Sequence, residues 1–426
     1  MDEARLRITI EQCVRRELRQ GHELPGQDQE LVESGALDSM GWVSVLECLE
    51  GALSLPDLAG RLGDLPARTT RALFAALSRE VSLPIGRAAV REAADAADRG
   101  DVRVLGWGRA AGTAQISVEQ IEREFGLSAG RLRERAGMET VARVDPGEDE
   151  ISLAMRAAED ALEKSKVEIE DIDWIVAASE TFLAYPSLAA VLHSRLLARE
   201  TCGALDVGGG CIGLMNCLCA ARGLVAAGSA RKVLVVTADV HSFWLKPGRV
   251  PGTFGALFGD GASAFVLAAH DGTEGTNVYR LADCQFGCAG AHAAALKAAF
   301  TQDGTMKLDF DGEALAHAAV SRLRKLVESI ELRSGVSRQE AAYFATHQPN
   351  PRLVKLFAQQ AGIPQEKIPS VVKSYGNLGA STCGFALAMA LDRVHEAQPG
   401  HRGPIFLAAV GPGLLWGSGL LRTSGE

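Results

Sequence analysis

The sequence has few aromatic residues and no excess of basic residues, and one uncharged stretch could be mistaken for a membrane span. Aromatic residues make up 5% of the 426 positions, and the formal net charge is −9. A nucleic-acid partner would need a basic face, so this balance argues against one. The uncharged stretch from Val207 to Ala221 is too short for a membrane span. The opening Met-Asp-Glu-Ala-Arg lacks the order of a secretory signal, so we expect a cytoplasmic protein.

Paired cysteine motifs are also absent from the sequence. The nine cysteines are scattered and include no C-x-x-C, the spacing typical of zinc sites and redox couples. We therefore expect no metal site. Most of the cysteines, Cys202, Cys217, Cys219, Cys284, Cys288 and Cys383 among them, are expected to be buried thiols that pack as small apolar residues.

The length and the apolar patterning suggest more than one domain. Residues 1–83 show helical spacing, with helices expected at 4–19, 39–50 and 65–83. Residues 84–101 are Ala-rich and charged, as in a linker. From residue 102 onward, short β-type runs alternate with helical segments. This alternation predicts an α/β domain with mostly parallel sheets, divided into halves at 102–270 and 271–426.

The first domain contains a short polar motif at the expected start of its second helix, Gly35-x-x-Asp38-Ser39-Met40. Asp and Ser are common at helix N-termini because they cap free backbone N–H groups, and this structural interpretation needs no further function. The residues from Asp28 to Asp64 include eight acidic side chains and one basic side chain, Arg61. Such a stretch suits either an acidic docking face or an ordinary solvated surface.

Cys211 is the cysteine best placed to be a nucleophile. It follows a short apolar run and the glycines Gly208-Gly-Gly, and it opens a long uncharged helix. A thiol at a helix N-terminus has its thiolate stabilised by the helix dipole, which predicts a lowered pKa. The glycines allow backbone and substrate to approach closely.

Two further polar residues lie where parallel α/β sheets place functional groups, beyond the carboxyl ends of strands. His347 ends the apolar run that begins at Tyr343, and Asn377 lies in a Gly-flanked loop before a helix. A histidine at a strand end is often structural, and an asparagine between glycines is often a turn residue. Position alone leaves both interpretations open.

Five segments taken together identify a family. They are Asp206-x4-Cys211-x-Gly213, Phe258-Gly-Asp-Gly-Ala262, His347-Gln-Pro-Asn350, Gly376-Asn377 and Gly411-x-Gly-Leu-Leu-Trp-Gly417. Their order and separations resemble β-ketoacyl-acyl-carrier-protein synthase III and its thiolase-fold relatives, over about Val102 to Arg422. The resemblance implies a duplicated fold of α-β-α-β-α layers. The motif at Ser39 likewise resembles acyl carrier proteins, which implies a small all-α domain ahead of it.

The resemblance also implies roles for individual residues. Cys211 would hold an acyl group as a thioester, with the N–H groups of Cys211 and Gly413 as the oxyanion hole. His347 and Asn377 would stabilise the enolate formed when a malonyl-type extender loses carbon dioxide, and Claisen attack would follow. A homodimer is implied, in which Tyr185 reaches the partner's acyl pocket.

The carrier resemblance implies 4′-phosphopantetheine on Ser39, attached by a phosphopantetheinyl transferase. Three departures from the synthase pattern matter. Gly208-Gly-Gly replaces the usual Ala-Ala, which would change the pocket floor, and Pro349 replaces Ala after the site histidine, a change that a first helical turn can absorb. The third departure concerns the acyl donor. Arg131 and Gly252 stand where members that use coenzyme A carry the Trp and Arg that hold adenine. These two changes favour a carrier-bound acyl donor over coenzyme A.

Three classes of function remain open on the sequence. The first is a decarboxylative condensing enzyme, in a fatty-acid-like or, given the fused carrier, a specialised polyketide or natural-product pathway. The second is an acyltransferase that passes the acyl group from Cys211 to a hydroxyl, an amine or a carrier thiol. The third is a non-catalytic partner subunit, which the complete Cys-His-Asn set counts against.

Overall fold

In a computed structural model of the chain, the residues that the structure describes are 3–18, 22–37, 39–53, 55, 58, 62, 68–81, 102–269, 279–290, 293, 296–301, 305–310, 312–396 and 403–423. The chain divides into two compact units, Met1–Glu92 with Ala289–Ala294, and Ala93–Cys288 with Ala295–Glu426. The expected linker at 84–101, Asp38 and the expected boundary between 270 and 271 lie outside the described residues.

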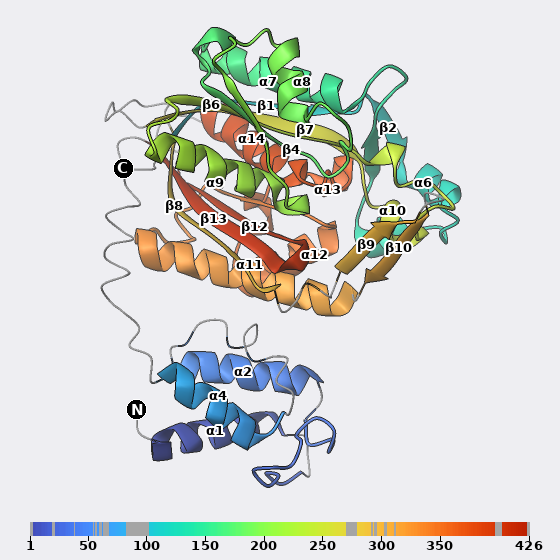
Figure 1. Cartoon of the computed structure of the whole chain (residues 1–426). Helices are drawn as coiled ribbons and strands as arrows, with labels where there is room; N and C mark the ends of the chain where they lie inside the picture. The colour runs from blue at the N-terminus through green and yellow to red at the C-terminus, as the bar shows by residue number, and fades with distance from the viewer. Residues whose placement is uncertain are drawn as a thin grey trace. The chain divides into compact units, whose positions relative to one another are not determined.

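The named helices of the first unit are α1 (Glu3–Glu17), α2 (Ser39–Leu53) and α4 (Thr70–Val81), close to the segments expected from helical spacing (Figure 1). Their apolar stripes, together with the loop before α2, bury a common core that includes Leu6, Ile10, Val14, Leu31, Trp42, Val45, Leu49, Leu73 and Leu77. Burial of this apolar surface is the main term that favours folding of the unit.

A disulfide joins two helices of the first unit. Cys13 on α1 and Cys48 on α2 are bonded, with their Cα atoms 5.7 Å apart. The sequence predicts buried free thiols, and for this pair that expectation is wrong. The two residues are 35 positions apart, so their proximity depends on how α1 packs on α2, which no local pattern encodes.

The second unit contains the remaining elements. Its strands are β1 (Val102–Ala111), β2 (Ala114–Ser117), β3 (Thr140–Arg143), β4 (Trp174–Ala178), β5 (Gly203–Asp206), β6 (Lys232–Val240), β7 (Asp260–Ala269), β8 (Tyr279–Cys288), β9 (Leu296–Phe300), β10 (Met306–Phe310), β11 (Tyr343–Thr346), β12 (Ile405–Gly411) and β13 (Leu415–Thr423). Its α-helices are α6 (Val118–Glu124), α7 (Glu150–Ser165), α8 (Leu188–Arg195), α9 (Gly213–Ala226), α10 (Gly252–Gly255), α11 (Gly312–Ser334), α12 (Pro351–Ala361), α13 (Val372–Tyr375) and α14 (Ser381–Glu396). A short π-helical segment, η2, covers Arg131–Ala136. The 3-10 turns are η3 (Ile169–Asp171), η4 (Gly210–Ile212), η5 (His241–Phe243), η7 (Gln365–Lys367) and η8 (Pro412–Leu414).

The main sheet has the strand order β11-β12-β13-β8-β1-β7-β6-β4-β5. Strand β1 joins two halves, because it pairs with β7 along its whole length and with β8 only at its first residues. Within the sheet, β4 is parallel to β5 and β6, and β11 is parallel to β12, but the other described pairs are antiparallel. The expectation of mostly parallel sheets is therefore wrong. One reason is the three-residue turn η8 between β12 and β13, since a parallel connection needs a crossover of about a dozen residues or more.

Helices cover the sheet halves and also separate them (Figure 1). Helix α14 contacts β1 and β7 of one half and β11 of the other, and α9 contacts β4, β6 and β13. Helices α7 and α8 pack on the outer face of the first half, whereas α11 packs on β12 and β13 of the second. This layering of helices and strands is the thiolase-like α/β arrangement that the sequence resemblance implies.

The expected burial is confirmed for some cysteines of the second unit and is wrong for others. Cys202, Cys217 and Cys383 are buried, as expected. Cys219 and Cys288 are exposed, so the expectation is wrong for these two. Cys288 is the last residue of β8, and Cys219 lies on an outward-facing side of α9.

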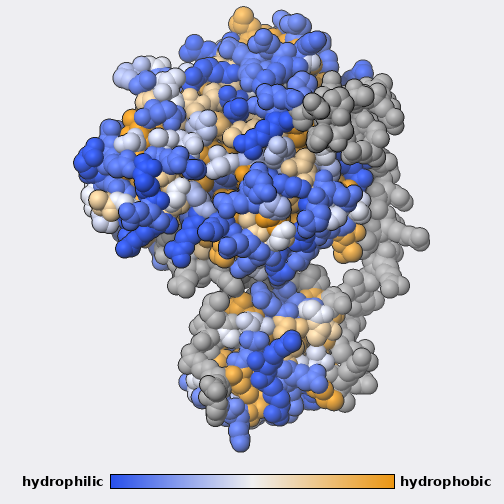
Figure 2. Space-filling model, turned by 180° about the vertical axis from the view of Figure 1, so that it is seen from behind, coloured by the Kyte–Doolittle hydropathy of each residue, from blue (hydrophilic) through white to orange (hydrophobic). Residues whose placement is uncertain are grey.

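Polar residues dominate the face of the larger unit that Figure 2 shows, and its apolar residues stand singly or in small groups. Within the described part of the chain, no helix combines the length and hydropathy needed to cross a membrane.

Candidate active site

Cys211 lies in the turn η4 at the entrance to helix α9. The preceding strand β5 ends at Asp206, whose carboxylate accepts hydrogen bonds of 2.9 and 2.8 Å from the first two N–H groups of α8. The chain then passes through Gly209 (φ 132°) and Gly210 (φ 59°), conformations that favour glycine. A β-carbon on Gly209 would lie 2.2 Å from Nδ2 of Asn216. The glycine run is therefore what lets the chain place Cys211 at this turn.

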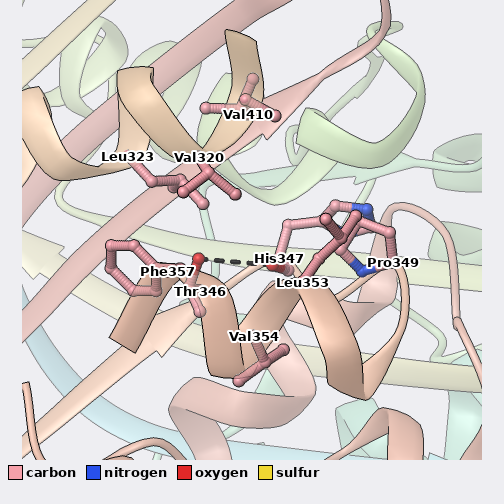
Figure 3. A pocket seen from close by; sticks show the side chains of 10 residues that line it. Val320, Leu323, Thr346, His347, Pro349, Leu353, Val354, Phe357 and Val410 are labelled. Atoms are coloured by element: carbon pink, nitrogen blue, oxygen red, sulfur yellow. Dashed lines mark hydrogen bonds between the residues drawn. The ribbon is translucent and has the colours of Figure 1, made fainter. Parts of the chain in front are cut away.

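His347 follows strand β11 and is buried. Its neighbours around a small cavity of about 30 Å³ are mostly apolar and include Val320, Leu323, Leu353, Val354, Phe357 and Val410 (Figure 3). Burial lowers the pKa of His347 to about 4, so the imidazole is neutral near pH 7. The next residue, Gln348, anchors the loop, since its side chain donates to the carbonyl of Pro369 (2.6 Å) and accepts from the N–H of Val371 (3.0 Å).

Asn377 lies between α13 and α14, with its side chain buried. Its Oδ1 accepts hydrogen bonds of 3.0 Å from the N–H of Gly379 and from the hydroxyl of Thr382. Its backbone N–H and carbonyl bond to Leu257 and Gly259 on the segment before β7. The amide is therefore oriented with Nδ2 as its donor group. A β-carbon on Gly259 would lie 2.0 Å from the carbonyl of Tyr375, which explains the glycine.

The segments that carry these residues meet at one place. A β-carbon on Gly213, at the start of α9, would lie 2.7 Å from Cβ of Ala380 and 2.9 Å from Cβ of Ala178. The start of α9, the loop before α14 and the end of β4 are therefore in direct contact. Glu180, just beyond β4, interacts with the Cys211 thiol and electrostatically with His347. The structure thus brings Cys211, His347 and the Asn377 loop into one site.

The same place holds three titratable residues that sequence reasoning missed, Glu180, Asp239 and His241. His241 Nε2 lies 3.8 Å from Glu180 Oε2, an ion pair when the ring is charged. The N–H of Glu180 donates to Asp239 Oδ1 at 2.6 Å. His241 Nδ1 is 2.9 Å from the carbonyl of Gly259, to which it donates. A β-carbon on Gly379 would lie 2.6 Å from His241 Cε1, so the Asn377 loop packs directly on this cluster.

The three groups shift one another's pKa values. Burial lowers the pKa of His241, but the ion-pair contact with Glu180 at 3.8 Å and the charge of Asp239 outweigh burial and raise it to about 9. Burial raises the pKa of Asp239 to about 7, against the opposing charge of His241. Burial would raise the pKa of Glu180, yet His241 and the Cys211 thiol together hold it below its usual value. Near pH 7 the site therefore contains a charged His241 beside an ionised Glu180.

The pKa of Cys211 departs from the sequence expectation. The helix-start argument predicts a lowered pKa, but burial first, and the charge and hydrogen bonding of Glu180 second, raise it well above the ordinary thiol value. The expectation is wrong because the residues around the helix start say nothing about burial or about a carboxylate that another strand brings beside the thiol. Cys211 is therefore a thiol rather than a thiolate near pH 7.

The other predicted site residues are placed as follows. Gly413 lies in η8 with φ 75°. A β-carbon on Gly210 would lie 3.6 Å from the ring of Pro412, the residue before Gly413, so η8 borders the turn that carries Cys211. Tyr185 is fully exposed on the chain. Ser39 is the first residue of α2.

A second cavity, of about 300 Å³, is lined by three arginines, Arg131, Arg135 and Arg352. Leu127, Leu257, Thr253 and Asn350 complete much of its wall. Nearby Gly252, at the start of α10, has no room for a side chain in this backbone arrangement, because a β-carbon would lie 2.6 Å from the carbonyl of Phe125. The cavity therefore has a strongly basic lining.

The missed residues carried a usable signal. Glu180 follows the apolar run that forms β4, and Asp239 and His241 occur at the end of the run that forms β6. Polar residues at the carboxyl ends of parallel strands converge on one edge of a sheet, and β4 and β6 are parallel neighbours. The rule that selected His347 would have selected these three as well.

Comparison with known proteins agrees with this geometry. Two family models match, "3-Oxoacyl-[acyl-carrier-protein (ACP)] synthase III" at residues 205–290 and its C-terminal counterpart at residues 332–423. The β-ketoacyl-[acyl-carrier-protein] synthase III of Rubrobacter xylanophilus is 30% identical over 320 residues, which cover 75% of this chain and 98% of that protein. The corresponding enzyme of Ruegeria sp. TM1040 is 30% identical over 326 residues, again 75% and 98% of the two chains.

The solved structures agree as well. The 3-oxoacyl-(acyl carrier protein) synthase III of Pseudomonas aeruginosa PAO1 superposes with a TM-score of 0.66 at 28% identity, covering 75% of this chain and 98% of that one. The matched segments contain Cys211, His347 and Asn377. The chain belongs to the β-ketoacyl-acyl-carrier-protein synthase III family and is an acyl-transferring, ketosynthase III-like condensing enzyme.

Proposed function

We propose that the enzyme forms an acyl thioester on Cys211 and condenses it with a carrier-bound malonyl-type extender, in a polyketide or other specialised pathway. The observation that carries this proposal is the convergence of a thiol with two neutral donors. His347 is uncharged near pH 7, and Asn377 has its Oδ1 satisfied by two hydrogen bonds. A neutral imidazole and an amide can both donate to a thioester carbonyl without introducing a proton strong enough to quench an enolate.

The reaction would run in two halves. In the first, the sulfur of Cys211 bonds to the acyl carbon and the donor thiol leaves. In the second, the extender loses carbon dioxide, and the electron pair of the broken C–C bond becomes an enolate held by His347 and Asn377. The enolate attacks the acyl carbon, and the electrons of the S–C bond return to Cys211. The N–H groups of Cys211 and Gly413 would stabilise the oxyanion of both tetrahedral intermediates.

An acyltransferase that uses only the first half is the second candidate. It would need no enolate and therefore no oriented amide. The two hydrogen bonds that fix Asn377, from Gly379 and Thr382, give the amide one direction and favour condensation.

Ser39 fits the attachment of 4′-phosphopantetheine. It is the first residue of the 15-residue helix α2, where the free N–H groups of a helix N-terminus favour a phosphodiester. The bound group would supply a flexible arm that ends in a thiol for acyl transfer. The nearby acidic residues are only partly available for docking, since Glu30 accepts hydrogen bonds from three backbone N–H groups and Asp28 pairs with Arg71.

The basic cavity supports a carrier-bound donor. Arg131, Arg135 and Arg352 line it, and an anionic pantetheine phosphate would be attracted by their charge. The backbone of Phe125 leaves no space for the larger residue that an adenine clasp would need at Gly252. These features favour a phosphopantetheine arm without the adenosine part of coenzyme A.

A homodimer is supported by an unpaired edge. Strand β5 is the last strand of the main sheet and has no strand beyond it among the described residues. Leu183, Tyr185 and Leu205, on or near this edge, are exposed large apolar side chains. A partner copy would pair with the free edge of β5 and cover these apolar side chains, and Tyr185 would reach the partner's acyl pocket.

Intact-protein mass spectrometry tests the proposal. Treatment with a phosphopantetheinyl transferase is expected to add one pantetheine mass, which is lost in Ser39→Ala. Acyl thioester donors are expected to add one acyl mass, which is lost in Cys211→Ala. Malonyl-carrier is then expected to release carbon dioxide and form a β-ketoacyl product. Turnover of the acyl group without carbon dioxide would establish the acyltransferase instead.

A further inference from the structure

Glu180 is a buried carboxylate at the nucleophile to which the condensation chemistry assigns no role. Its Oε1 is buried and has no hydrogen-bond partner among the described residues, although the carboxylate interacts with the Cys211 thiol. Gly210, next to the nucleophile, would place a β-carbon 3.8 Å from this oxygen. An unsatisfied buried carboxylate is costly, so its position calls for a functional reason.

The surroundings of Glu180 keep it ionised. The groups that face it are His241 on η5, Asp239 on β6, Cys211 on η4 and His347 after β11. Asp260, on β7, acts on it indirectly through His241. The charged His241 compensates the buried negative charge, so Glu180 is held as a base rather than as a neutral acid. His347 is neutral near pH 7, so it brings no positive charge that would stabilise a thiolate at Cys211.

We propose that Glu180 is the general base for Cys211, a catalytic residue of the acyl-transfer half-reaction. As the sulfur of Cys211 bonds to the acyl carbon, the thiol proton moves to the Glu180 carboxylate. When the tetrahedral intermediate collapses, the bond to the donor sulfur breaks with its electron pair, and the Glu180 carboxylic acid returns the proton to that thiolate. One proton passes between two sulfur atoms, and Glu180 ends as the carboxylate that it was at the start.

His241 and Asp239 are positioning residues in this scheme. His241 holds the charge of Glu180, and the carboxylate of Asp239 fixes the backbone of Glu180 through the 2.6 Å hydrogen bond. The proposal rests on Cys211 being the acylated residue, which is part of the proposed function. It adds the means by which a thiol with a raised pKa becomes a nucleophile near neutral pH.

Single-turnover acylation of Cys211 tests the role, with acyl-pantetheine as donor and rapid-quench mass spectrometry from pH 6 to 9. The wild-type rate is expected to change little over this range. Glu180→Gln is expected to be about 10² to 10⁴-fold slower at pH 7 and to gain about tenfold per pH unit, because the thiolate must then form before attack. Glu180→Ala is expected to recover with added formate and not with chloride. Circular dichroism checks that the variants are folded.

Iodoacetamide alkylation of Cys211 is a second test of the role of Glu180, and it needs no acyl donor. The alkylation rate is expected to rise only slightly with pH in the wild type and about tenfold per pH unit in Glu180→Gln. Equal slopes in the two proteins would overturn the role of Glu180, as would acylation of Glu180→Gln within threefold of the wild-type rate. If no donor acylates the wild type but the alkylation slopes differ, the proposed function fails while Glu180 still stands as the proton acceptor.

Discussion

The buried ion pair between His241 and Glu180 predicts an alkaline loss of stability. The folded-state pKa of His241 is raised from 6.5 to about 9. A group with a raised pKa contributes stability that is fully present below its unfolded pKa and is lost as the pH rises through its folded pKa. The interval from 6.5 to about 9 corresponds to about 3 kcal/mol of unfolding free energy.

His241→Asn removes the charge but keeps a donor for the carbonyl of Gly259. At pH 6.5 we expect this variant to be less stable than the wild type by about 3 kcal/mol, within the usual range for breaking a buried pair. By pH 9.5 the difference is expected to shrink by about 1 to 3 kcal/mol. The decrease is expected to be about 1 kcal/mol if Glu180 and Asp239 take up protons in the variant, because protonation removes their unpaired charges.

Urea unfolding followed by tryptophan fluorescence measures this difference, since four of the five tryptophans lie in the second unit. His193→Asn is the matched control for loss of a histidine outside the cluster. A destabilisation by His241→Asn that stays within about 0.5 kcal/mol between pH 6.5 and 9.5 would refute the charged state assigned to His241.

Two further predictions concern the backbone and amide that shape the site. Gly209→Ala is expected to lower the melting temperature and slow acylation, at a cost of about 1–3 kcal/mol, because φ is 132° and the added carbon would lie 2.2 Å from Nδ2 of Asn216. Gly208→Ala, with no atom within 4 Å of the added carbon, is its matched control in thermal unfolding. Thr382→Val removes the hydroxyl that fixes Asn377 Oδ1 at 3.0 Å, and about tenfold slower condensation is expected, with acylation unchanged. Equal slowing of both half-reactions would contradict the role assigned to the amide.

Local patterns were sufficient for most of the elements and for the three residues that the family resemblance names. The apolar run that begins at Tyr343 forms β11, and His347 lies just beyond its end, as expected. Helical spacing likewise located α1 and α2 to within a few residues. These features depend on periodicities of two and 3.6 residues and on glycine at positive φ, which are properties of short segments.

The antiparallel pairing in the sheet and the Cys13–Cys48 disulfide were decided only by the tertiary structure, as was the protonation state of the site. The pKa of Cys211 is the clearest case. The helix start that follows it favours a thiolate, yet burial and Glu180, contributed by the end of another strand, favour the thiol. The sequence by itself determined which residue is the nucleophile candidate. Folding decided which carboxylate lies beside it, because charge interactions depend on distance and burial rather than on position along the chain.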